Sequence, residues 1–116
     1  MRRDMDFIRE ILMATEANRE IDTTGFSPEE VWNHVRLLKQ AGYIDALVAA
    51  YRAPYQFQIF ALTWEGHEFS DAMRDDTLWE KAKQTFLKPG ASWTAKLLFE
   101  WLKVEIKRRF IGGSPG

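Results

Sequence analysis

The stretch SPEEVWNHVRLLKQAGYID, residues 27–45, decides the fold. Ser27 is followed by a proline and, three residues on, by Glu30, which is the pattern of a helix start with a capping box. Apolar residues then recur at steps of three and four, as they do on the buried side of a helix, and they are Val31, Val35 and Leu38. Gly42 supplies a left-handed stop. The stretch therefore predicts one amphipathic helix that ends just before YID.

A helix is expected before this stretch and a β-hairpin after it. Residues 4 to about 18 carry an apolar stripe at helical spacing, whereas residues 19–26 are polar and contain Gly25, which predicts a loop or one short strand. The segments YIDALVAAY and YQFQIFALT are rich in β-branched and aromatic residues and are separated by RAPY. They predict two strands joined by a short loop. Their alternation is imperfect, so we expect both faces of the hairpin to be partly covered.

Helical segments are expected to follow the hairpin. Thr63 can cap the segment WEGHEFSDAMRDD. Thr77 and Glu80 form a second match to the capping box, so the helix is expected to restart near residue 75 and to run to about residue 87.

A last helical arm follows the breaker KPGA. Ser92 is expected to cap a helix at about 93–110. The order of elements is that of a winged helix with an added arm. We therefore predict an α+β, winged-helix-like domain at 1–87 (helix, short strand or loop, helix, β-hairpin, helix), a C-terminal helix at 91–111 that extends it, and a flexible tail at 112–116.

Composition sets limits on the class of protein. The 116 residues fit one small domain, and 46% hydrophobic with 28% charged residues is an ordinary globular balance. A net charge of −1 argues against strong, sequence-indifferent binding to nucleic acid but allows a local basic face. The absence of cysteine excludes disulfides and thiolate metal sites. With no secretory signal and no apolar run near the ~20 residues of a membrane span, we expect a cytoplasmic protein with no membrane partner.

Three segments resemble a known family. They are MRRDMDFIREIL, VWNHVRLLKQAGYID and LTWEGHEFSDAMRDDTLWEKAK. In this order, over about residues 1–85, the chain resembles the small phage- and prophage-borne proteins catalogued as domain of unknown function 2513. The resemblance implies a winged-helix-like fold and a mobile-element setting, and it implies no activity. The arm at 91–116 carries no motif of this kind.

A looser likeness is to winged-helix repressors of the multiple-antibiotic-resistance type. The matching positions are Val35, Leu38, Gly42 and Ile44, where those repressors have the end of their DNA-recognition helix, and Leu62, Thr63 and Gly66 after the sheet. These are mostly packing and capping positions, so they indicate the fold rather than the function.

A DNA-binding face is one interpretation of residues 27–56. The outward residues of the helix include Asn33, Arg36, Lys39 and Gln40, and those of the hairpin tip include Arg52 and Tyr55. Asn, Arg and Gln can read base edges, and Lys can meet phosphate. The alternative is a solvated face of a core helix. It is favoured by Glu29 and Glu30 at the helix start and by the lack of a full helix within residues 19–26.

The last helix carries a second candidate surface. Its apolar stripe of Trp93, Leu97, Trp101 and Leu102 must pack either on its own domain or on a second copy. We expect a homodimer, by analogy with other winged-helix proteins that have terminal helices. The basic residues Lys103, Lys107, Arg108 and Arg109 either contact phosphate or an acidic partner, or simply complement the helix C-terminus.

Catalytic patterns are weak. His67 lies between Glu65 and Glu68, but a zincin helix needs two histidines four residues apart. We therefore expect no enzyme activity, no metal, no cofactor and no small-molecule substrate. Two functions stay open. One is a phage-type transcriptional regulator that binds double-stranded DNA, and the other is a non-enzymatic protein–protein interaction module that binds a host or phage protein, such as a host factor or defence complex.

Overall fold

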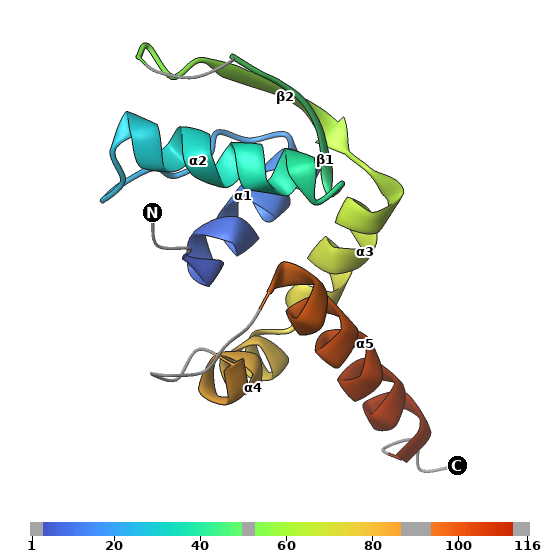
Figure 1. Cartoon of the computed structure of the whole chain (residues 1–116). Coiled ribbons are helices and arrows are strands. Elements are labelled where there is room, and N and C mark those ends of the chain that lie inside the picture. The colour runs from blue at the N-terminus through green and yellow to red at the C-terminus, as the bar shows by residue number, and fades with distance from the viewer. Residues whose placement is uncertain (1–3, 50–52, 87–93, 113–116) are drawn as a thin grey trace. The chain divides into compact units, whose positions relative to one another are not determined.

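The computed structural model describes residues 4–49, 53–86 and 94–112. Figure 1 shows the elements, which in chain order are α1 (Met5–Ala17), α2 (Pro28–Gln40), β1 (Ile44–Val48), β2 (Phe57–Leu62), α3 (Trp64–Met73), α4 (Asp76–Phe86) and α5 (Ala95–Gly112). The predicted α+β class is confirmed.

Two compact units make up the chain, Met1–Ser70 and Asp71–Gly116. The division falls inside α3. The helices α4 and α5 both belong to the second unit. The physical reason is that α4 packs along α5, where Lys81 Nζ lies 3.1 Å from a Glu105 carboxylate oxygen.

Local side-chain chemistry sets the start of the first two helices. The Asp4 carboxylate accepts a hydrogen bond from the Phe7 N–H at 3.0 Å and so caps α1. At α2 the predicted capping box is confirmed, because the Ser27 hydroxyl accepts from the Glu30 N–H and the Glu30 carboxylate accepts from the Ser27 N–H. Gly42, with φ at +83°, ends α2 in the left-handed region as expected.

The core of the first unit lies between α1, α2 and the hairpin. Its buried apolar side chains from the two helices are Met5, Phe7, Ile8, Ile11, Leu12, Ala14, Val31, Trp32, Val35 and Leu38. His34 is buried with them, and both ring nitrogens are used. Nδ1 donates to the Glu30 carbonyl at 2.7 Å, and Nε2 accepts from the Asp4 N–H at 3.0 Å. This imidazole thus ties the start of α1 to α2.

The segment between α1 and α2 forms no strand. Residues 18–27 run as an irregular loop, so of the two forms expected for residues 19–26 the loop is present. The Phe26 ring anchors the end of this loop by stacking on Phe7, with centroids 4.0 Å apart.

β1 and β2 pair antiparallel, from Ile44 opposite Leu62 to Val48 opposite Phe57. Figure 1 shows this hairpin running back along α2 toward the N-terminal end of that helix. An irregularity between Asp45 and Ala46 breaks the strict alternation of sides. Ile44 and Ala46 are buried, whereas Leu47 is 62% exposed and Phe60 is 52% exposed. The outer face of the hairpin is therefore exposed, whereas the sequence predicted that both faces would be partly covered.

Thr63 joins the end of the hairpin to the end of α2. Its hydroxyl donates to the Gly42 carbonyl at 2.6 Å and accepts from the Gly66 N–H at 3.0 Å, so it caps α3 as predicted. The Thr63 N–H also donates to the Tyr43 carbonyl at 3.1 Å. Gly66 lies so close to this carbonyl that a Cβ atom would be 1.9 Å from the Tyr43 oxygen.

The caps of α4 and α5 each lie two residues from the predicted caps. Asp75, not Thr77, caps α4, since its carboxylate accepts from the Leu78 N–H at 2.9 Å. At α5 the Thr94 hydroxyl accepts from the Leu97 N–H at 3.1 Å. Ser92, the predicted cap, lies outside the described residues. Both cases have the same cause, because several residues that can cap stand close together and packing selects one of them.

Gly66→Ala is expected to destabilise the protein by about 1–3 kcal/mol, the usual cost of forcing an extra methyl group into a packed site. The Tyr43 oxygen is held by Thr63 and cannot move away without loss of a hydrogen bond. Urea unfolding followed by circular dichroism would measure this change. Glu65→Ala, an exposed neighbour in the same helical turn, is the control and should shift the midpoint little. Equal midpoints for both variants would contradict the close contact.

Ser27→Ala is expected to lower the free energy of unfolding by about 1 kcal/mol, as the loss of a helix N-cap does.

The Ser27 N–H, followed by the Ser27 hydroxyl, holds the pKa of Glu30 below its ordinary value. A lowered folded-state pKa stabilises the protein above the unfolded-state pKa and loses that effect as the pH falls through the folded-state pKa. The stability difference between the native chain and Glu30→Gln should thus shrink below about pH 4.3. Thermal unfolding between pH 7 and pH 3 would show it, and a constant difference would contradict it.

Candidate functional site

The outer side of α2 carries the residues predicted to read DNA. Asn33 and Arg36 are half-buried, and Lys39 and Gln40 are exposed. The Arg36 guanidinium donates to the Asn33 side-chain oxygen at 3.2 Å and lies 5.4 Å from the centre of the Trp32 ring. A cation over the face of a tryptophan is attracted by the ring. Asn33 and Arg36 therefore form a linked pair on the helix surface.

Tyr55 brings the hairpin to the N-terminal end of α2. Its ring lies 5.8 Å from the Trp32 ring. Burial, followed by the charge of Glu29 and a hydrogen bond to it, raises the pKa of the Tyr55 hydroxyl above its ordinary value. Tyr55 takes a positive φ of 46°, which is uncommon for a residue with a side chain. Arg52, the other predicted residue of the hairpin tip, lies outside the described residues.

Trp32 links the helix part of this site to the hairpin, a role that the sequence analysis did not assign to it. The residue is buried, at 6% exposure, and its ring lies near both the Arg36 guanidinium and the Tyr55 ring. The spacing of four residues from Trp32 to Arg36 was the signal that could have shown this, because such residues are neighbours on a helix.

Two donors at this site have no acceptor. Among the residues that the structure describes, the Trp32 indole N–H and the Arg36 Nε–H are buried without a hydrogen-bond partner. A buried donor without a partner costs about 1–3 kcal/mol.

Charge on the α2 face is close to balanced. Glu29 and Glu30 lie in the first turn, and Lys39 lies in the last turn with Arg36 between them. Tyr55 and Ser27 engage the two carboxylates. The face therefore offers a positive C-terminal half beside a negative start.

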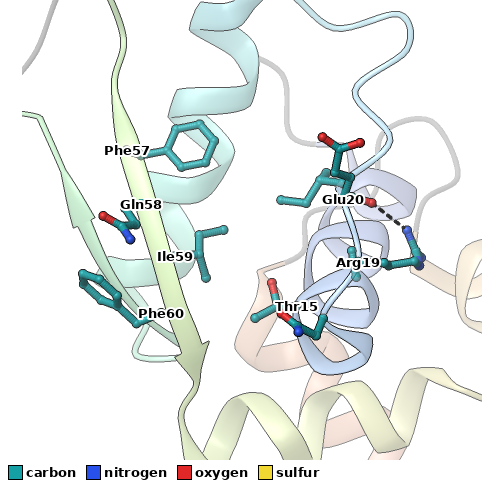
Figure 2. A pocket seen from close by; sticks show the side chains of 10 residues that line it. Thr15, Arg19, Glu20, Phe57, Gln58, Ile59 and Phe60 are labelled. Carbon is teal, nitrogen blue, oxygen red and sulfur yellow. Dashed lines mark hydrogen bonds between the residues drawn. The ribbon is translucent and has the colours of Figure 1, made fainter.

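A cavity of about 280 Å³ opens between β2 and the loop that follows α1 (Figure 2). Figure 2 shows Phe57 and Ile59 pointing from β2 toward the segment that carries Glu20, whereas Gln58 and Phe60 project from the opposite face of the strand. The full lining is Ala14, Thr15, Asn18, Arg19, Glu20, Ile21, Phe57, Gln58, Ile59 and Phe60.

A second cavity of about 240 Å³ is lined by acidic residues. Three of these carboxylates already interact within the chain: Asp4 caps α1, Glu10 forms an ion pair with Arg19, and Asp22 accepts a hydrogen bond from the Thr24 N–H. Within 4–49, 53–86 and 94–112, no group of three or more His, Asp or Glu side chains is placed to hold a metal ion. The exposed His67 lies with its Nδ1 atom 3.5 Å from the Glu16 carboxylate.

The predicted apolar stripe of α5 divides between inside and outside. Leu102 is fully buried within its own chain, Trp101 is half-buried, and Leu97 is 54% exposed. Val104, which the prediction did not include, is 53% exposed and lies on the same side of the helix as Leu97. Trp93 lies outside the described residues. In the basic cluster, Arg108 reaches Glu105 at 3.1 Å, and Lys103 reaches Glu100 at 3.7 Å.

The family model described as hypothetical protein DUF2513 matches residues 2–92. The chain belongs to this family. The resemblance seen in the sequence is thereby confirmed, and the DUF2513 match spans α1 to α4 and ends before α5.

A relative of this DUF2513 protein in Haemophilus influenzae, described as an uncharacterized protein, is 38% identical over 94 residues. The aligned part covers 73% of the present chain and 78% of the relative. No solved structure matches the chain. In the described part of the chain, no helix is both long enough and apolar enough to cross a membrane.

Proposed function

We propose that this DUF2513 protein is a DNA-binding transcriptional regulator of winged-helix type, as expected for a phage or prophage protein of the cytoplasm. The supporting observation is the linked pair of Asn33 and Arg36 on the outer side of α2, with Tyr55 of the hairpin at the same end of the helix. A winged helix binds with one helix in the major groove and the hairpin on the backbone or minor groove.

The order of elements in the first unit supports this geometry. α1, α2, the β1–β2 hairpin and the start of α3 follow the winged-helix order, and the hairpin folds back along α2 (Figure 1). Residues 18–27 supply a loop where many winged helices have another helix. We therefore assign the reading role to α2 and the role of the wing to the hairpin.

Base reading, rather than bulk charge, is the expected source of affinity. Arg36 can bind a guanine in bidentate fashion, and Asn33 or Gln40 can bind an adenine. The unmet Nε–H of Arg36 would gain an acceptor on the base or phosphate. A net charge of −1 leaves little sequence-independent attraction. The protein should therefore prefer particular sites strongly and bind random duplex weakly.

A dimer formed through α5 would contain two copies of α2. Leu97 and Val104, each more than half exposed, lie seven residues apart on one side of α5, with the half-buried Trp101 between them. Residues at this spacing can pack against a second helix. We propose that these residues form a symmetric contact, with Leu102 supporting the helix from inside its own chain.

A protein–protein interaction module is the second candidate. It is favoured by the open outer face of the hairpin, where Leu47 and Phe60 are both more than half exposed, and by the carboxylates of Glu29 and Glu30 at the start of α2. Such a module would bind a host or phage protein and would not need DNA.

The double variant Arg36→Ala, Lys39→Ala should lose at least tenfold in affinity for duplex DNA selected from a randomised 20-base-pair library. One base contact and one phosphate contact would be removed. Fluorescence anisotropy at several salt concentrations would measure this, and the dependence on salt should become flatter.

Arg74→Ala, Lys96→Ala is the matched control, because it removes the same two charges from exposed positions of the second unit. It should bind like the native chain. If the native protein enriches no sequence, or if both double variants bind equally, α2 is not a DNA reader, and the protein-binding candidate takes its place.

Leu97→Gln, Val104→Gln should convert a dimer into a monomer, because the change removes the apolar groups from the proposed contact. Light scattering after size exclusion would report the mass. Lys96→Gln, Lys107→Gln changes two other exposed positions of α5 and should leave the dimer intact. A native chain that is monomeric at all concentrations would refute the contact.

A further inference from the structure

The edge of β2 that faces away from β1 is open. The Ala49 N–H donates to the Gln56 carbonyl at 2.9 Å, and the same register continues through Val48 opposite Phe57. Backbone groups alternate in direction along an antiparallel strand, so those of Phe57 and Ile59 point away from β1. In the described segments, β1 and β2 form a two-stranded sheet, and no backbone hydrogen bond joins Phe57 or Ile59 to the facing loop.

The cavity of about 280 Å³ lies directly beside this edge. Phe57 and Ile59 supply apolar side chains on the strand side (Figure 2). Ile21, from the loop that follows α1, adds an apolar residue to the lining. Exposed strand edges bind extended peptides by adding a strand, with backbone hydrogen bonds for affinity and pockets for alternate side chains. The site thus combines a set of backbone donors and acceptors with an apolar recess.

Glu10 keeps the loop from closing this space. Its carboxylate holds the Arg19 guanidinium at 2.6 and 2.8 Å and accepts from the Asp22 N–H at 2.8 Å. The hydrogen bond with Arg19 is the largest cause that lowers the pKa of Glu10. These bonds bind the loop to α1, so the far wall of the cavity is held apart from β2.

Charge on the cavity wall selects among possible peptides. The Arg19 cation is neutralised by Glu10. Glu20 also lines the cavity, and its carboxylate has no ion-pair partner among the described residues. The wall is therefore left with one negative charge beside apolar groups. A peptide that complements it carries alternating apolar residues and a lysine or arginine.

We propose that β2 and the loop at Arg19–Ile21 form a docking groove for an extended segment of a partner protein, which adds to the sheet as a third strand. The segment has apolar side chains at every second position, directed toward Phe57, Ile59 and Ile21, and a basic side chain opposite Glu20. This site is separate from the outer side of α2 and does not depend on DNA binding.

The probe is a synthetic peptide of alternating valine and threonine with a lysine at each end. The full chain should bind it, and hydrogen exchange measured by NMR should slow at the amides of Phe57 and Ile59, because these N–H groups would donate to the added strand. A peptide with prolines at the central positions cannot make these bonds and should leave both amides unchanged.

Charge exchange tests the role of the cavity wall. Glu20→Lys should weaken binding of the lysine-ended peptide about fivefold, within the range of an exposed ion pair, and should favour a glutamate-ended peptide instead. Glu68→Lys makes the same change at an exposed position of α3 that does not line the cavity, and should bind like the native chain.

Three results would overturn the proposal. One is no binding of the lysine-ended peptide at millimolar concentration. Another is binding without slower exchange at Phe57 and Ile59. The third is slower exchange at these amides that grows with protein concentration in the absence of peptide, because a second copy of the chain would then occupy the edge.

Discussion

The junction at Thr63 holds the first unit together. Its hydroxyl donates to Gly42 and its N–H donates to Tyr43, so the end of β2 is joined to the turn that leads from α2 into β1. A two-stranded hairpin alone is marginally stable in water. Here its register relative to α2 is set by these two bonds and by the close approach of Gly66 to the Tyr43 carbonyl. The positions of α2 and of the open edge of β2 relative to each other both depend on this junction.

The two proposed surfaces use the hairpin in different ways. Tyr55, which precedes β2, contacts Trp32 of α2, whereas Phe57 and Ile59 line the cavity beside the open edge of β2. On the α2 side the available chemistry is side-chain hydrogen bonding with almost no net charge, which suits the reading of base edges. At the strand edge it is backbone hydrogen bonding with an apolar recess, which suits an extended peptide. One small hairpin can serve both, because Tyr55 and the edge of β2 offer unlike chemical groups.

Local sequence signals predicted most of the first unit. The capping box of Ser27 and Glu30, the stop at Gly42 and the hairpin were all predicted and are present, since each depends on neighbours in sequence. What the sequence did not predict depends on contacts between distant residues. Two such contacts are the ion pair of Glu10 with Arg19, called the Glu10 clamp below, and the ring contact of Trp32 with Tyr55. Neither contact follows a local sequence pattern. The caps of α4 and α5 were misplaced because several competent residues stand within one turn of each other.

The Glu10 clamp shows why the open edge of β2 is a feature of the fold and not simply a missing strand. The loop after α1 faces β2 across the cavity, and its backbone at Asp22 and its side chain at Arg19 are both bound to α1 through Glu10. Both bonds would be lost if the loop moved to pair with β2. The exchange would replace charge-assisted bonds, which are the stronger kind, with neutral backbone bonds. An open edge is an aggregation risk that proteins usually cover or charge, and here Glu20 stands beside it with the loop held back. A strand supplied by a partner gains the same backbone bonds without breaking the clamp, so the geometry favours an external strand over closure by the chain itself.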